Sequence, residues 1–339
     1  MTGVGSVKAR RPPVFNGFWP GLRAADRDVR LGKVVVLDHT IDSIPSDTNP
    51  MQHKRDLMAL AAVAAALFAL SAAPACAQNG SNGNQAKLDA LYTASLAGIP
   101  LGKGGWMIDI GDDQYTAAVS GVTTGLLRVF ASGEGSGIAR GYIINGVMTS
   151  SAYAASITAD KKTEDLRMGF VGGVVKDLSV EPPTPPHPER IPVTDAHRRG
   201  VTDPMTASIV KVSGNGSPLS PDACIKTSSV FDGWLRYDLT LSFKRMETVK
   251  SDKGYAGPVV VCAVYFRPIA GYIPNRPAVK YLAEQRDMEV WLAPLGTTRY
   301  LVPYRMTVPT PLGTGALQAT QFLSGPATPK PTPTSLGGQ

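Results

Sequence analysis

The sequence predicts a mainly β fold, a curved antiparallel sheet or an open β-barrel with one short helix near residues 203–212. About twelve short apolar and β-branched runs are separated by turn signals every eight to twelve residues, as in all-β domains. Apolar and polar residues alternate from Leu235 to Phe243, which indicates a strand with one buried face. The first half of the domain shows no sustained helical period.

The chain begins with two segments that are not expected to belong to the folded domain. Residues 1–50 have no sustained period and are interpreted as a disordered upstream extension, translated from a start codon set too early. Met51 is followed by a short cationic region and an Ala- and Leu-rich run, and Ala75-Cys76-Ala77 has the form that signal peptidase cuts after. Residues 51–77 are therefore predicted to be a signal peptide, cleaved between Ala77 and Gln78, which places the protein in the periplasm.

Two alternatives to soluble export stay open. Residues 57–75 could remain as an uncleaved inner-membrane anchor, although a comfortable span takes about 20 apolar residues. Cys76 could be lipidated, but Ala73-Pro74-Ala75 before it differs from the Leu-Ala-Gly-like triplet that usually precedes such a cysteine. We therefore expect no stable membrane span after cleavage.

The remainder divides by composition. Residues 78–87 are small and polar and are predicted to be a flexible leader. Residues 88–323 are predicted to form a single β-rich domain. The proline-rich segment 181–192 is interpreted as a surface connector within it, because proline cannot donate to a sheet ladder. Residues 324–339 have too little apolar content to fold and are predicted to be a disordered tail.

Strands are expected on both sides of the connector. Before it, Asp112-Asp113 is the turn of a predicted hairpin, and further strands are expected at 142–144, 147–157 and 166–171. After it, Thr202 or Asp203 can cap the short helix, and Pro204 occupies a position where a missing N–H costs nothing. Asp232-Gly233 is a tight-turn signal. The remaining strands form a predicted meander at 257–271, 288–294, 300–308 and 315–323.

Two cysteines remain after the predicted cleavage, Cys224 and Cys262. An even number in an exported protein predicts a disulfide bond between them. Neither these cysteines nor His187 and His197 have the spacing of metal ligands, so no metal site and no cofactor are predicted.

Three segments, TDPMTA (202–207), VFDGWLRYDL (230–239) and EVWLAP (289–294), resemble the family called domain of unknown function 3108. The resemblance extends over about residues 88–323. It implies an exported envelope protein of Gram-negative bacteria and no established activity, and the strand pattern is similar to periplasmic open-barrel proteins that hold acyl chains. The family-motif residues are Asp203, Pro204, Phe231, Asp232, Gly233, Tyr237 and Trp291.

The leading functional hypothesis is a non-enzymatic protein that binds a lipid, another apolar ligand or an envelope component. We expect an apolar cavity of several hundred Å³, formed by inward residues of the second-half strands. The residues proposed for this cavity are Trp106, Leu235, Leu239 and Leu241.

Two other classes of function are weighed against this hypothesis. An assembly factor acting by contact with an envelope protein would show an exposed apolar patch or sheet edge. A hydrolase would need a general base, for which His197 is the candidate; GEGSGI at 133–138 lacks the G-x-S-x-G spacing and is interpreted as a flexible hairpin loop. The net charge of +7 comes from interspersed residues with no basic run longer than a pair, so no nucleic-acid partner is predicted.

Overall fold

The computed structural model describes residues 85–124 and 133–326. The first seven strands are β1 (Ala86–Leu96), β2 (Ile99–Ile110), β3 (Gln114–Thr123), β4 (Gly133–Ile144), β5 (Val147–Ala159), β6 (Lys162–Val171) and β7 (Val174–Glu181). The others are β8 (Val210–Lys211), β9 (Lys226–Phe231), β10 (Arg236–Lys250), β11 (Lys253–Gly254), β12 (Ala256–Ala270), β13 (Glu289–Pro294), β14 (Tyr300–Thr310) and β15 (Gly313–Gly325).

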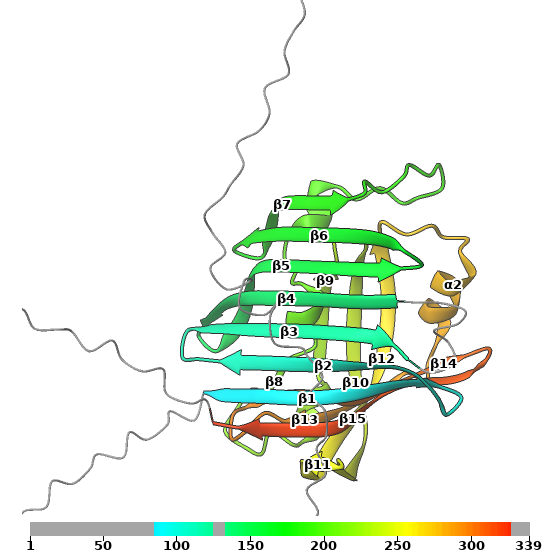
Figure 1. Ribbon diagram of the computed structural model, residues 1–339. Coiled ribbons are helices and arrows are strands. Elements are labelled where there is room, and N and C mark those ends of the chain that lie inside the picture. The colour runs from blue at the N-terminus through cyan, green and yellow to red at the C-terminus, as the bar shows by residue number, and fades with distance from the viewer. Residues whose placement is uncertain (1–84, 125–132, 327–339) are drawn as a thin grey trace, which may run out of the picture. The chain divides into compact units, whose positions relative to one another are not determined.

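All of these strands belong to one open sheet, which confirms the predicted mainly β, antiparallel fold. Its order is β7-β6-β5-β4-β3-β2-β1-β15-β14-β13-β12-β10-β9, with β8 paired to β14 and β11 paired to β15. Only the short β11–β15 pairing is parallel. The sheet bends back on itself, so that β9, β10 and β12 lie behind β1–β7 and run across them (Figure 1).

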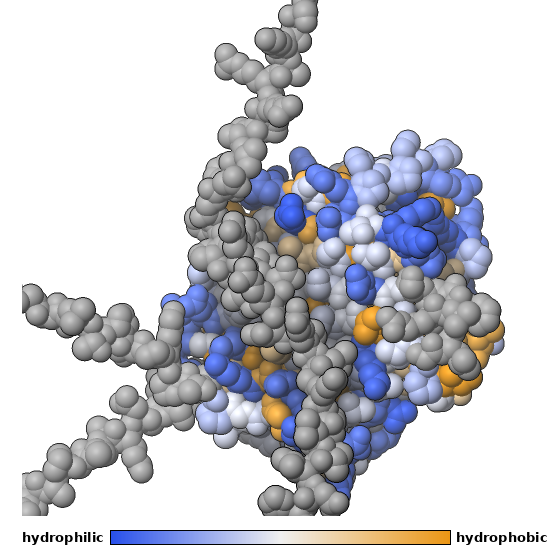
Figure 2. All heavy atoms as spheres, in the orientation of Figure 1, coloured by the Kyte–Doolittle hydropathy of each residue, from blue (hydrophilic) through white to orange (hydrophobic). Residues whose placement is uncertain are grey.

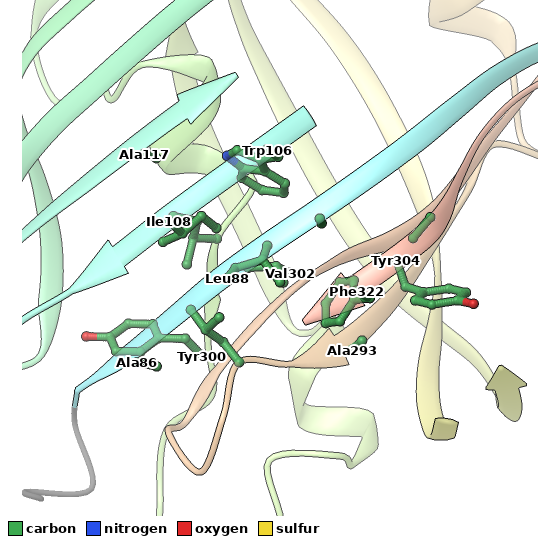
Figure 3. Close-up of a cluster of buried hydrophobic side chains, with 14 of the residues drawn as sticks. Ala86, Leu88, Trp106, Ile108, Ala117, Ala293, Tyr300, Val302, Tyr304 and Phe322 are labelled. Atoms are coloured by element: carbon green, nitrogen blue, oxygen red, sulfur yellow. The ribbon is translucent and has the colours of Figure 1, made fainter. Parts of the chain in front are cut away.

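A hydrophobic core lies between these two layers. In β1 the inward residues Ala86, Leu88, Ala90 and Tyr92 are each at most 4% exposed and alternate with more accessible ones, because side chains of a strand point to opposite faces in turn. They pack with residues of β2 and of the second-half strands. Figure 3 shows the cluster, with Leu88, Trp106 and Ile108 labelled beside Val302, Tyr304 and Phe322.

The two edges of the open sheet are bridged by the segment 199–202. Arg199 pairs with Val174 of β7, and Thr202 pairs with Val230 of β9, each as an isolated bridge. The Val201 amide donates to the Gly173 carbonyl at 3.0 Å. The segment therefore lies between the edge strands and leads directly into α1 (Pro204–Ala207), whose Met205, Thr206 and Ala207 are buried.

The predicted helix at 203–212 is too long at its C-terminal end. Asp203 caps α1 and Pro204 is its first residue, as expected, but the helix ends at Ala207. Val210 and Lys211 form β8, which pairs with Tyr300 and Leu301. The β-branched residues in Ile209–Val212 explain this result, since they favour extended backbone where a partner strand is available.

A second helix, α2 (Pro277–Glu284), was missed. Proline at its first position and the Ala, Leu, Lys and Glu that follow are a helix signal, but the helix is only eight residues long and none of its residues is buried. Two 3₁₀ helices, η2 (Asp195–Arg198) and η3 (Pro221–Cys224), complete the regular structure. Within the described residues, no helix is long and apolar enough to span a bilayer.

Several predicted boundaries differ from those of the structure. The strands begin at Ala86 and end at Gly325, so the leader and the tail each lose two residues to the sheet. Residues 133–138, interpreted as a loop, are the first half of β4. Residues 182–194, which hold most of the predicted connector, form no strand or helix. The upstream extension, the signal peptide with Cys76, Ala77 and Gln78, and most of the leader and tail lie outside the described residues.

The predicted one-sided burial of β10 is also incorrect. Phe243 is 40% exposed, whereas Asp238 on the opposite face is only 5% exposed. Arg236 and Arg267 both form ion pairs with Asp238, which compensates the buried carboxylate. Near Asp238, β10 therefore carries partly or fully buried side chains on both of its faces.

The predicted disulfide bond between Cys224 and Cys262 is confirmed, with an S–S distance of 2.03 Å. It joins η3 to β12, and both cysteines belong to a second buried cluster with Val210, Val260 and Leu292. The bond therefore fixes the η3 segment against the sheet. A disulfide bond is typical of proteins in an oxidising compartment.

Candidate apolar binding site

A cavity of about 720 Å³ lies against the inner side of β1–β5. Residues of β14 and β15 border it at one side, and Pro204, Met205 and Ser208 reach it from α1. Adjacent strands are about 4.8 Å apart, so five strands give it a length of roughly 19 Å across the sheet. Small-molecule sites commonly have volumes of about 300–1,000 Å³, so the cavity has the size of a binding site.

The cavity exists because glycine replaces side chains where three neighbouring strands meet. Gly104 of β2 pairs with Gly121 of β3, and Gly121 pairs with Gly135 of β4. One rung further along, Val119 pairs with Gly137. All of these positions line the cavity. Elsewhere in β2 the inward positions carry Trp106, Ile108 and Ile110, which are buried in the core.

Of these four glycines, only Gly104 is required by space. A Cβ atom on Gly104 would lie 2.6 Å from the Ser120 carbonyl oxygen, whereas one on Gly137 would lie 3.4 Å from Met205 Cε, at the limit of ordinary contact. On Gly121 and Gly135 the nearest atoms would be 3.6 and 3.5 Å away, which is ordinary contact. Backbone packing therefore does not explain the last two glycines, whereas an open cavity does.

The cavity wall carries apolar side chains that are partly open to solvent. Val119 is 41% exposed, Ile157 is 49% exposed and Met306 is 37% exposed, and all three line the cavity. Lys103 and Glu134 border the cavity, but they alternate with the inward residues Gly104 and Gly135, so their charged side chains point to the other face of the sheet. A ligand with a long apolar part would bury the apolar side chains and gain about 25 cal/mol for each Å² of apolar surface removed from water.

A buried hydrogen-bond network fixes α1 at the cavity floor. The fully buried Asp203 carboxylate accepts from the Met205 and Thr206 amides at 3.0 and 2.9 Å, and from the hydroxyls of Ser150 and Thr206 at 2.5 and 2.6 Å. The Thr206 hydroxyl also bonds the Tyr115 hydroxyl at 2.7 Å. Burial raises the pKa of Asp203, while these hydrogen bonds favour its charged form. The network joins α1 to β3 and β5, so it fixes the position of Met205.

Lys226 of β9 holds the other end of α1. Its Nζ atom donates to the Ala207 and Ile209 carbonyls at 3.4 and 3.1 Å. Burial lowers the pKa of Lys226 to about 8. The ammonium thus satisfies carbonyl groups at the end of a short helix, at the cost of its own hydration.

This pKa predicts how stability depends on pH. Below pH 8 the folded and the unfolded chain both carry the Lys226 proton, whereas between about pH 8 and 10.5 only the unfolded chain keeps it. The free energy of unfolding should therefore rise with pH in this window, by up to about 1.4 kcal/mol per pH unit. Urea unfolding of the wild type and of Lys226→Met from pH 7 to 9.5 measures the difference. Equal slopes for both proteins would contradict this assignment.

The F-D-G family motif holds a turn against the opposite edge of the sheet. Asp232 accepts from the Trp234 and Leu235 amides at 2.9 and 2.7 Å. Gly233 has a φ of 100°, and a Cβ atom there would lie 2.3 Å from Leu166 Cδ1 on β6. Phe231 is fully buried in a cluster with Leu166. The motif therefore closes the gap between β9 and β6 and does not line the cavity.

The other two motif residues also have structural partners. The Tyr237 ring lies 5.3 Å from that of Phe266. Trp291 is 5% exposed and donates to Glu247 Oε2 at 2.7 Å, and the guanidinium groups of Arg245 and Arg305 lie 5.5 and 4.7 Å from its ring. Of the family-motif residues, only Pro204 lines the cavity.

The residues predicted for the cavity are placed differently by the structure. Trp106 lines the cavity, but Leu235, Leu239 and Leu241 do not. The prediction that the second-half strands form most of the cavity was therefore wrong. Leu241 packs against the cluster that contains the disulfide bond. The alternation of apolar and polar residues predicts which side chains are buried. It could not predict this cavity, which forms where glycines provide no side chain.

His197, the predicted general base, has a local structural role. Its Nδ1 atom lies 3.1 Å from the Thr194 amide nitrogen and 3.2 Å from the Thr194 hydroxyl, which caps η2, and it does not line the cavity. Among the described residues, no group of three or more His, Cys, Asp or Glu side chains could hold a metal ion.

Comparison with known proteins gives a family but no activity. The model of the family described as "Protein of unknown function (DUF3108)" matches residues 91–320. No curated protein matches the chain. A solved structure described as a β-barrel-like protein of domain of unknown function DUF1849, from Brucella abortus, aligns with a TM-score of 0.37 and 9% sequence identity. The alignment covers 70% of this chain and 97% of that one.

Proposed function

This chain belongs to the DUF3108 family of proteins of unknown function, and we propose that it binds the acyl chain of a lipid in the cavity beside β1–β5. The observation that carries the proposal is the rung Gly104–Gly121–Gly135, which leaves one inward position on each of three neighbouring strands without a side chain. Solvent-accessible Val119 and Ile157 beside this rung supply an apolar wall. An elongated hydrocarbon fits such a site better than a compact polar molecule does.

The proposal includes a role in binding and no catalytic step. The polar groups at the cavity are dispersed backbone and hydroxyl groups. We place the protein in the periplasm, as the segment 51–77 and the disulfide bond support.

Binding of a fluorescent long-chain fatty acid tests this function. We expect saturable binding of one probe per chain, with a dissociation constant in the micromolar range or below. Palmitate should displace the probe, whereas hexanoate should not, because its short chain leaves most of the cavity wall exposed. Absence of saturable binding, or equal displacement by both acids, would contradict the proposal.

The alternative of an assembly factor acting through a sheet edge has less support. The segment 199–202 occupies part of both edges. Lys176 and Asp177 are exposed on the edge strand β7, and charged residues on an edge oppose pairing with another strand. We therefore favour the cavity over the edges as the functional surface.

A further inference from the structure

We propose that the protein docks onto a lipid bilayer through two neighbouring turns, Ala97–Gly98 between β1 and β2 and Pro311–Leu312 between β14 and β15. This inference rests on the proposed function, because a bilayer is the source of an acyl chain that is poorly soluble in water. It adds to that function the surface by which the ligand enters and leaves.

The two turns lie side by side and expose large apolar side chains. The Ala97 amide donates to the Thr314 carbonyl at 2.9 Å. Ile99 is 62% exposed and Leu312 is 77% exposed. The stretches 97–101 and 310–314 contain no charged residue. Figure 2 shows hydrophobic surface at the right-hand margin, where Figure 1 places the β14–β15 turn.

These turns are continuous with the cavity. Leu101, two residues after Ile99, lines the cavity, and its carbonyl accepts from the Thr124 amide at 2.8 Å. On β5, Ala159 at the same end of the strands also lines it. A bilayer in contact with Ile99 and Leu312 would therefore lie next to one end of the cavity. The residues of β2 between Ile99 and the cavity carry no polar side chain.

The size and charge of this surface favour a lipid partner over a protein. A stable protein interface buries about 1,200–2,000 Å², far more than two side chains provide. Shallow insertion of two aliphatic side chains suits weak, reversible membrane binding. The two turns themselves carry no charged residue, so we expect binding without a requirement for anionic lipid and with little dependence on salt.

Sedimentation with uncharged phosphatidylcholine vesicles tests this surface. Wild type should bind, and Ile99→Asp/Leu312→Asp should bind at least about tenfold more weakly. The matched control is Ile144→Asp/Val147→Asp, which changes side chains that are 57% and 61% exposed at the turn between β4 and β5. This turn lies at the opposite end of the strands (Figure 1), so the control should bind like the wild type.

The fatty acid probe separates this proposal from the proposed function. Both double variants should keep the wild-type affinity for the probe, which also shows that they are folded. Leu312→Asp alone, in a turn, provides a second variant that perturbs no strand. Vesicle binding without probe binding would support the docking surface and contradict the acyl-chain site. Absence of wild-type binding to vesicles, or an equal loss in the control, would overturn the docking proposal.

Discussion

Filling the cavity from its wall is expected to weaken binding of the fatty acid probe about a hundredfold, or roughly 2.7 kcal/mol. The variant is Gly121→Leu/Gly135→Leu, in which two inward positions of neighbouring strands each gain a branched side chain. A Cβ atom at either position meets only ordinary contacts, so the new side chains extend into the open cavity. They therefore occupy the volume that the acyl chain needs.

The matched control places the same side chain on the other face of the sheet. In Gly105→Leu the new Cβ atom lies 3.6 Å from Leu91 Cδ2, and Gly105 does not line the cavity. This variant should bind the probe like the wild type. Thermal unfolding should show all three proteins folded at the assay temperature. Equal affinity of the cavity variant and the control would show that the ligand does not lie along the glycine rung.

Replacing the carboxylate beneath α1 should have the largest effect on stability, a loss of about 5 kcal/mol in the free energy of unfolding for Asp203→Ala. The change leaves the two capped amides and two hydroxyls without their acceptor, at about 1–3 kcal/mol for each unsatisfied group. Urea unfolding measures the loss. Because Met205 depends on this network, probe binding should weaken as well.

Asp203→Asn distinguishes the geometry of the cap from its charge. Asparagine keeps an oxygen acceptor for the Met205 and Thr206 amides, and its amide group can donate to the hydroxyls of Ser150 and Thr206. We expect a loss of about 1–2 kcal/mol and near-normal probe binding. A loss as large as that of Asp203→Ala would indicate that the negative charge itself holds the network together.

The strands and the cap of α1 could be predicted from the sequence because their determinants are local. The turn at Asp112-Asp113 and the alternation around it define the β2–β3 hairpin. Asp203 followed by Pro204 defines the start of α1. The C-terminal end of this helix depends instead on β14, which offers Val210 a partner across a large sequence separation. Such tertiary competition is not visible in a local pattern.

The cavity could not be predicted for a different reason. The glycines at 133–137 have the composition of a loop, and glycine in a strand is ordinarily a weakening feature. That these glycines line a cavity is evident only from the strand register, which places Gly135 beside Gly121 and Gly121 beside Gly104. The sequence did contain one sign of the cavity. Gly133, Gly135 and Gly137 occupy alternate positions, which share one face if the segment is a strand.

The central claim, that the glycine-lined cavity holds an acyl chain, is tested most directly by native mass spectrometry of the protein purified from its own cells. We predict a species heavier than the polypeptide by the mass of one lipid or fatty acid, released on denaturation. This species should be absent from Gly121→Leu/Gly135→Leu and present in Gly105→Leu. A wild-type protein found only at the mass of its polypeptide, or an adduct retained equally by the cavity variant, would contradict the account.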